Sequence, residues 1–121
     1  ILAAIALPAY QNYVAKAQST SGLADIRGGV TAFEEGIQGG ERPAGTAATN
    51  ADIGLAADTP RCSAINVAGN WDATNGQTIQ CVLQGNPNVS GDTVTLTRDA
   101  NGQWDCSNNI GNANWEPNGC P

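Results

Sequence analysis

The chain contains 121 residues, which suits a single small domain. Charged residues make up 13% of it, about half of the usual share, and the formal net charge is -6. This composition is typical of a secreted, loop-rich protein, and the five scattered basic residues argue against a phosphate-binding surface, so we expect no direct nucleic-acid partner.

The first eighteen residues change character along their length. Residues 1–10 are almost entirely apolar, whereas residues 11–18 mix polar and apolar side chains with no loop signal between the two parts. The apolar run is too short to cross a bilayer alone, because a span requires about 20 residues. Pro8 predicts a kink or a loosened turn. Such a helix is typical of a subunit that assembles through it, and a buried core helix is the alternative.

A single apolar stripe marks the next part of this helix. Its members recur at steps of three and four within an arc of about 80°, which predicts a face that packs on a sheet. They are Leu23, Ile26, Val30, Phe33 and Ile37. Gly22, Gly28 and Gly29 each cost about 1 kcal/mol relative to alanine, so this part should depend on packing. Gly39-Gly40 predicts the end of the helix.

Residues 41–61 show no strong periodicity and indicate a long connection, with at most a short helical turn or strand over residues 53–57. Four strands are expected after it, approximately over residues 64–72, 78–83, 93–97 and 103–106. Asn75-Gly76 and Asn101-Gly102 predict hairpin turns. Strands in this meander order form an antiparallel sheet, whose inner face is the natural partner of the helix stripe.

The tail over residues 107–119 is rich in asparagine and glycine and cannot form regular structure. Ile110 and Trp115 are its large apolar residues. Two interpretations stay open: both side chains pack inward, or Trp115 and the loop backbone form a surface that faces a receptor.

Four cysteines in a chain without histidine favour disulfides over a metal site, and they indicate an oxidising compartment. The gaps between Cys62 and Cys81 and between Cys106 and Cys120 do not resemble a zinc knuckle. The sequence permits three pairings of these cysteines.

No catalytic constellation is found, so we expect neither an enzyme nor a cofactor. Without histidine there is no Ser/His or Cys/His pair. Glu34-Glu35 is interpreted as solvated surface. The segment from Asp99 to Gly102 superficially suggests a calcium loop, but the acidic residue required at the twelfth position is absent, and a hairpin explains it better. Asn88-Val89-Ser90 matches the glycosylation rule only as a short motif that arises often by chance.

The N-terminal sequence resembles that of a known family. ALPAY over residues 6–10, QNY over 11–13 and AKAQ over 15–18 closely resemble the N-terminal helix of type IVa pilins, the major subunits of bacterial type IV pili. The family's mature chain opens with an N-methylated aromatic residue and a glutamate, and neither is present. We therefore expect an N-terminally truncated chain that lacks the front of the helix.

The resemblance implies an α+β fold with a long N-terminal helix on a four-stranded antiparallel sheet. The expected regions are a helix over 1–40, protruding as an assembly stem over 1–22 and packed on the sheet over 23–40, then a connecting αβ-loop over 41–62, the sheet over 63–106, and a disulfide loop with its tail over 107–121. The residues expected to form the assembly helix are Ile1, Leu2, Ile5, Leu7, Pro8, Tyr10, Tyr13 and Val14.

The family closes its C-terminal loop with a disulfide, so the resemblance favours Cys62–Cys81 and Cys106–Cys120. Closing a loop of the latter size stabilises the fold by roughly 3 kcal/mol in the chain-entropy model. In related pilins this loop contributes to adhesion to host glycans and to abiotic surfaces. The candidate receptor residues are Asn112, Asn114, Trp115, Glu116 and Pro117.

The function implied is a subunit that polymerises into a type IV pilus used for surface adhesion, twitching motility and DNA uptake. Its partners would be itself and the pilus assembly machinery. It would lie in the inner membrane before assembly and in an extracellular filament afterwards. Two alternatives are a major pseudopilin of type II secretion, which typically has a calcium site and no terminal disulfide loop, and a small secreted adhesin that acts as a monomer.

Overall fold

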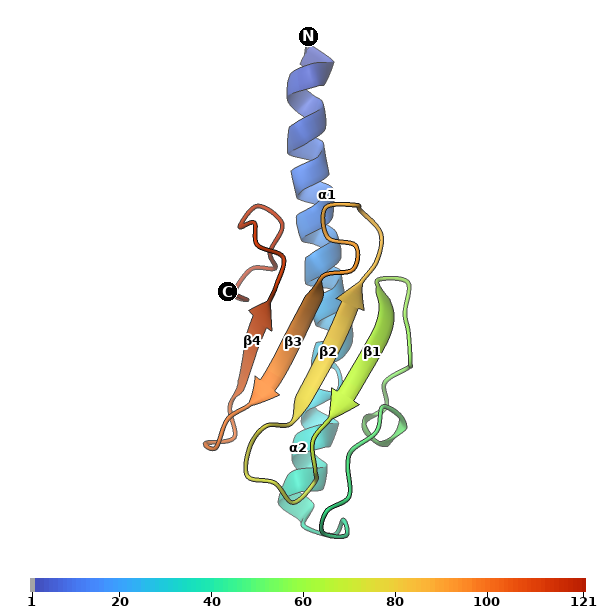
Figure 1. Ribbon diagram of the computed structural model, residues 1–121, viewed down its shortest axis with the longest axis vertical. Coiled ribbons are helices and arrows are strands. Elements are labelled where there is room, and N and C mark those ends of the chain that lie inside the picture. The colour runs from blue at the N-terminus through green and yellow to red at the C-terminus, as the bar shows by residue number, and fades with distance from the viewer. Residues whose placement is uncertain (1) are drawn as a thin grey trace.

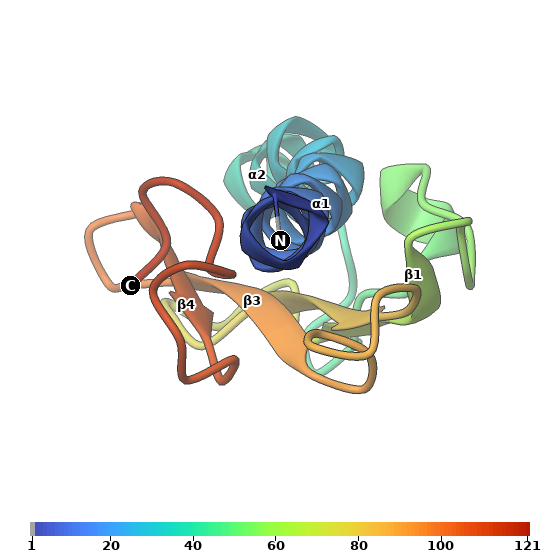
Figure 2. The same ribbon diagram turned by 90° about the horizontal axis from the view of Figure 1, so that it is seen from above.

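The protein is a four-stranded antiparallel sheet with a helical layer across one face (Figures 1 and 2). The computed structural model describes the backbone of residues 2–121 and the side chains of residues 7–121. The helices are α1 (Leu2–Arg27), α2 (Val30–Gly39) and the short 3-10 helix η1 (Ala51–Ile53), and the strands are β1 (Cys62–Ala68), β2 (Thr78–Leu83), β3 (Thr93–Arg98) and β4 (Trp104–Asn108). The strands neighbour one another in chain order. The predicted fold class is therefore confirmed.

The helical layer is interrupted once, at Gly28-Gly29, where the sequence suggested a continuous helix. The N–H of Gly29 donates to the carbonyl of Ile26 at 3.2 Å, and helical bonding resumes where Phe33 N–H donates to the Gly29 carbonyl at 3.0 Å. A Cβ at Gly29 would lie 2.8 Å from Cδ1 of Ile53 in the αβ-loop, so a larger residue would force that side chain to shift. The break is thus one tight turn that admits the αβ-loop against the helix.

Pro8 lies inside the helical layer, and a glycine follows its C-terminal end. α1 continues through Pro8, with helical backbone on both sides of it. α2 ends at Gly39, and the following C-cap residue, Gly40, has a left-handed φ of 64° that suits glycine. None of the helices described here is both long and apolar enough to cross a bilayer.

The core lies between the helix stripe and the inner face of the sheet. Leu23, Ile26 and Phe33 are buried, and Val30 and Ile37 are partly buried against the same cluster. Opposite them, alternate residues of the two central strands point inward, because successive side chains in a strand face opposite sides. These inward residues are Ile79, Cys81, Leu83, Val94 and Leu96.

The β1–β2 connection differs from the predicted hairpin turn at Asn75-Gly76. β1 ends at Ala68, so the connection spans residues 69–77 and includes Trp71, which was expected in the strand. Gln77 organises this connection: its buried side chain donates through Nε2 to the carbonyls of Asn70 at 2.9 Å and Ala73 at 2.7 Å. The long connection brings Trp71 into the core beside Phe33, with the ring centroids 5.1 Å apart.

A disulfide joins β1 to β2 directly beneath α1. Cys62 and Cys81 are bonded and fully buried. The helix crosses them at Gly22, where a Cβ would lie 3.0 Å from Sγ of Cys81 and 2.5 Å from Leu83. Glycine therefore allows the close approach of α1 to the Cys62–Cys81 disulfide.

Candidate interaction surfaces

The first candidate surface is the part of α1 that projects beyond the sheet and loops (Figure 1). Leu7, Tyr10 and Tyr13 are 56%, 65% and 72% exposed, and they are the large hydrophobic residues exposed among the described side chains. Pro8 is also exposed, whereas Val14 is partly buried. Of the other residues expected in the assembly helix, Ile1 and the side chains of Leu2 and Ile5 lie outside the described part of the chain.

The projecting part is shorter than the predicted stem of residues 1–22. Contact with the body starts at Asn12, whose Oδ1 accepts a hydrogen bond from Nε1 of Trp115 at 2.8 Å. Ala15 and Ser19 are fully buried, and Oγ of Ser19 donates to the Trp115 carbonyl at 2.6 Å. The difference arises because the C-terminal loop folds back onto α1, which the sequence could not place. We define the stem as residues 7–13, within the described side chains, because Leu7, Tyr10 and Tyr13 are all exposed although Asn12 already contacts the C-terminal loop.

The second candidate surface is the C-terminal loop over residues 107–121. A Cys106–Cys120 disulfide closes it, and Nδ2 of Asn108 donates to the Cys120 carbonyl at 2.6 Å. Ile110 is buried at 8% exposure. These links hold the irregular loop against the sheet edge, beside α1 (Figure 2).

The loop residues expected to face a receptor divide into two groups. Trp115 is partly buried against the core and Pro117 is buried, so these side chains turn inward. Asn112 and Glu116 are half-buried, and Asn114 is exposed. Of the two interpretations of Trp115, the inward one describes its position.

We expect Trp115→Phe to lower the free energy of unfolding by about 1 kcal/mol, because it removes the indole donor to Asn12 but keeps most of the ring. Asn12→Ala in the same background should then add little, since both changes remove one interaction. Chemical denaturation of the four chains of this cycle checks the coupling. Fully additive losses would show that the indole donor does not fasten the loop.

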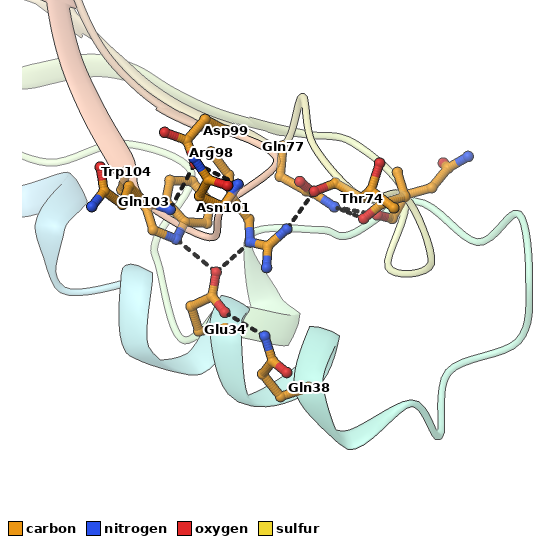
Figure 3. Close-up of polar contacts among 11 residues, drawn as sticks. Glu34, Gln38, Thr74, Gln77, Arg98, Asp99, Asn101, Gln103 and Trp104 are labelled. Atoms are coloured by element: carbon orange, nitrogen blue, oxygen red, sulfur yellow. Dashed lines mark hydrogen bonds and ion pairs between the residues drawn. The ribbon is translucent and has the colours of Figure 1, made fainter.

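A polar network fastens α2 to the opposite end of the sheet (Figure 3). Oε1 of Glu34 accepts hydrogen bonds from Nε of Arg98 and, at 3.0 Å, from Nε1 of Trp104, while Oε2 accepts from Gln38 at 3.2 Å. Nη1 of Arg98 also donates to the Thr74 carbonyl at 2.6 Å, in the β1–β2 connection. The interpretation of Glu34 as solvated surface was wrong, because its partner comes from a strand far along the chain. Glu35 is exposed, as expected.

This network lowers the pKa of Glu34. Burial alone raises its pKa, but the hydrogen bonds from Arg98, Gln38 and Trp104 and the charge of Arg98 outweigh that effect and hold the pKa below its ordinary value of 4.5. A carboxyl with a lowered folded pKa stabilises the fold above the unfolded pKa, and this contribution is lost as the pH falls through the folded value.

We therefore expect Glu34→Gln to reduce the free energy of unfolding by about 1–2 kcal/mol at pH 7, a modest figure because the carboxylate is partly exposed. The difference from the parent should shrink as the pH falls from 4.5 through the lowered folded pKa of Glu34. Urea titrations of both chains across this range check it. The raised pKa of Asp92 and the lowered pKa of Asp52 act in both chains and cancel in the comparison. A difference independent of pH would contradict the assignment.

The cleft at the end of α2 carries no catalytic arrangement among the described residues. Its volume is about 420 Å³, and it is lined by Glu35, Glu41, Asp52 and Arg42 among others. Arg42 already pairs with Asp52 at 3.5 Å and lies 4.3 Å from the centre of the Trp71 ring. Oδ1 of Asp99 accepts hydrogen bonds from the backbone N–H groups of Asn101 and Gln103, in keeping with the hairpin that was preferred to a calcium loop.

Comparison with known proteins finds one matching family and several similar relatives. Residues 15–121 match the family model for pilin, a bacterial filament protein. Fimbrial protein Q of Moraxella bovis is 38% identical, with 99% of this chain and 86% of the relative aligned. A fimbrial protein of Pseudomonas aeruginosa is 31% identical over 100% of this chain and 83% of its own length. The type IV major alpha-pilin of Moraxella bovis is 31% identical over 88% and 74%, respectively.

Proposed function

The chain belongs to the pilin family of bacterial filament proteins, and from this premise we propose that it polymerises through its N-terminal helix into a type IV pilus. As a pilin it is a structural subunit of an extracellular filament rather than an enzyme. The observation that supports the helix as the assembly element is the exposure of Leu7, Tyr10 and Tyr13 on a helix that projects from an otherwise well-packed body.

The stem exposes apolar side chains, whereas the outward positions of the sheet are polar. Fully burying one large apolar side chain contributes about 1.5–3 kcal/mol, and aromatic pairs add about 0.5–1.5 kcal/mol. Stems packed side by side bury these residues without any change within the folded body. The body stays in contact with water, because its outward strand positions are polar: Thr93, Thr95 and Thr97 alternate with the buried residues of β3.

We place the unassembled subunit in the inner membrane, delivered to the pilus by an assembly machinery, and we assign the filament to surface adhesion, twitching motility and DNA uptake. For adhesion to host glycans or abiotic surfaces, the C-terminal loop offers the exposed Asn114 and the half-buried Asn112 and Glu116. Because Trp115 and Pro117 hold the loop on the body, they act as its support in this proposal.

Electron microscopy of cells that express the intact protein tests the polymer. We expect thin filaments that an antibody against the body labels. A matched chain that begins at Gln11 keeps the Asn12, Ala15 and Ser19 contacts and should be a soluble monomer. Absence of labelled filaments from cells with the complete export machinery would overturn the proposal. Glycan binding by that monomer as tight as by the filament would favour the secreted-adhesin alternative.

A further inference from the structure

Three asparagines in the chain precede a glycine, namely Asn75, Asn101 and Asn118. In such a pair the backbone nitrogen of the glycine can attack Cγ of the asparagine side chain. The new N–C bond closes a five-membered succinimide, and the side-chain nitrogen leaves as ammonia. Water then opens the ring to aspartate or isoaspartate. Glycine favours the attack because it has no side chain to obstruct the ring closure.

The structure distinguishes the three pairs by what the glycine nitrogen already does. Gly76 N–H donates to the Arg98 carbonyl at 3.0 Å, and Gly102 N–H donates to the Asp99 carbonyl at 3.0 Å. In the third pair, the N–H that closes the turn belongs to Cys120, the residue after the glycine, and it donates to the Pro117 carbonyl at 3.2 Å. Among the described residues, Gly119 N–H has no hydrogen-bond acceptor. Only this nitrogen can attack without first breaking a native hydrogen bond.

The surroundings of the third pair also leave room for the reaction. Asn118 and Gly119 are exposed, and a Cβ added at Gly119 would meet no atom within 4 Å. The side chains of Asn108 and Asn112 in the same loop form hydrogen bonds, but among the described residues none is found for the side chain of Asn118. We propose that Asn118 is a site of spontaneous deamidation in the folded protein, whereas folding protects Asn75 and Asn101.

The product would change the junction between the C-terminal loop and α1. Asn118 and Lys16 line the same two hollows beside α1, together with Tyr13 in one and Glu116 in the other. Deamidation adds a carboxylate opposite the only lysine of the chain. The aspartate form introduces an opposite charge to Lys16, and the isoaspartate form lengthens the backbone inside the Cys106–Cys120 loop.

Peptide mapping of the full-length, disulfide-bonded chain after incubation at mildly alkaline pH tests the proposal. Trypsin separates Asn75, in residues 62–98, from Asn101 and Asn118, in residues 99–121, and fragment ions resolve the latter two. We expect conversion at Asn118 at least about tenfold faster than at the other two sites, whose amides must first open locally. The reduced, denatured chain should convert all three at similar rates. Equal rates in the folded chain would overturn the proposal.

Substitution gives a second readout. Asn118→Gln should abolish the slow acidic shift of the folded chain on isoelectric focusing, because a glutamine side chain closes a ring far less readily. Asn75→Gln, also at an exposed position, should leave the shift unchanged. A chain with Asn118→Gln that acidifies as fast as the parent would place the reaction elsewhere.

Discussion

Tyr10→Asp together with Tyr13→Asp is expected to abolish filament formation while leaving the folded body intact. The two rings are 65% and 72% exposed in the subunit, so little packing within it is lost. In a stem bundle, the same positions would place two carboxylates in an apolar contact, where the effective penalty is several kcal/mol per ion. Filament counts by electron microscopy measure the first effect, and thermal unfolding of the purified subunit measures the second.

The matched control adds the same charge away from the stem. Asn75→Asp with Ala100→Asp introduces two carboxylates at exposed loop positions at the opposite end of the sheet from the stem. We expect filaments from this chain at the parental level. If both doubly charged chains assemble, the stem is not the assembly contact. If neither assembles, net charge rather than position controls polymerisation.

Gly36→Ala is expected to lower the free energy of unfolding by about 3 kcal/mol, because the added methyl group overpacks the core. A Cβ at Gly36 would lie 2.2 Å from Cζ3 and 2.8 Å from Cε3 of Trp71, and a rigid indole cannot yield at one atom. The Trp71 ring also contacts Phe33 and the guanidinium of Arg42. Thermal unfolding should show a fall in Tm of about 10 °C.

Gly39→Ala in the same helix is the control, because it should not lower the free energy of unfolding. A Cβ at Gly39 meets nothing within 4 Å, so only helix propensity changes. Alanine is favoured over glycine inside a helix by about 1 kcal/mol, and less at its last turn. We expect Gly39→Ala to be neutral or slightly stabilising. Equal destabilisation by both substitutions would show that Trp71 does not pack on Gly36.

The sequence predicted those parts of the fold that depend on local patterns. The stripe that includes Leu23, Ile26 and Phe33 and the alternation of Val94 and Leu96 identify faces, and a face needs only the period of its own element. The Asn101-Gly102 turn forms where expected because its hydrogen bonds lie within residues 99–103. The long β1–β2 connection was missed because Gln77 replaces a tight turn with side-chain bonds that no local motif announces.

The candidate surfaces likewise include features that local sequence predicts and features that depend on distant contacts. The exposure of Tyr10 and Tyr13 follows from an apolar helix longer than the sheet beneath it, whereas the point at which the body begins depends on Trp115 reaching Asn12 across the whole chain. The prediction that Glu34 is solvated was wrong for the same reason, since the residues near Glu34 in the sequence do not indicate that Arg98 pairs with it.

By itself, the sequence therefore determined the order of the elements and which face of each is apolar, since period and turn chemistry are properties of neighbouring residues. The tertiary structure alone decided where the stem ends, that the pKa of Glu34 is lowered and which Asn-Gly pair keeps a free amide. Each of these depends on atoms that lie far apart in the sequence and meet only when the sheet, the helix and the C-terminal loop are packed together.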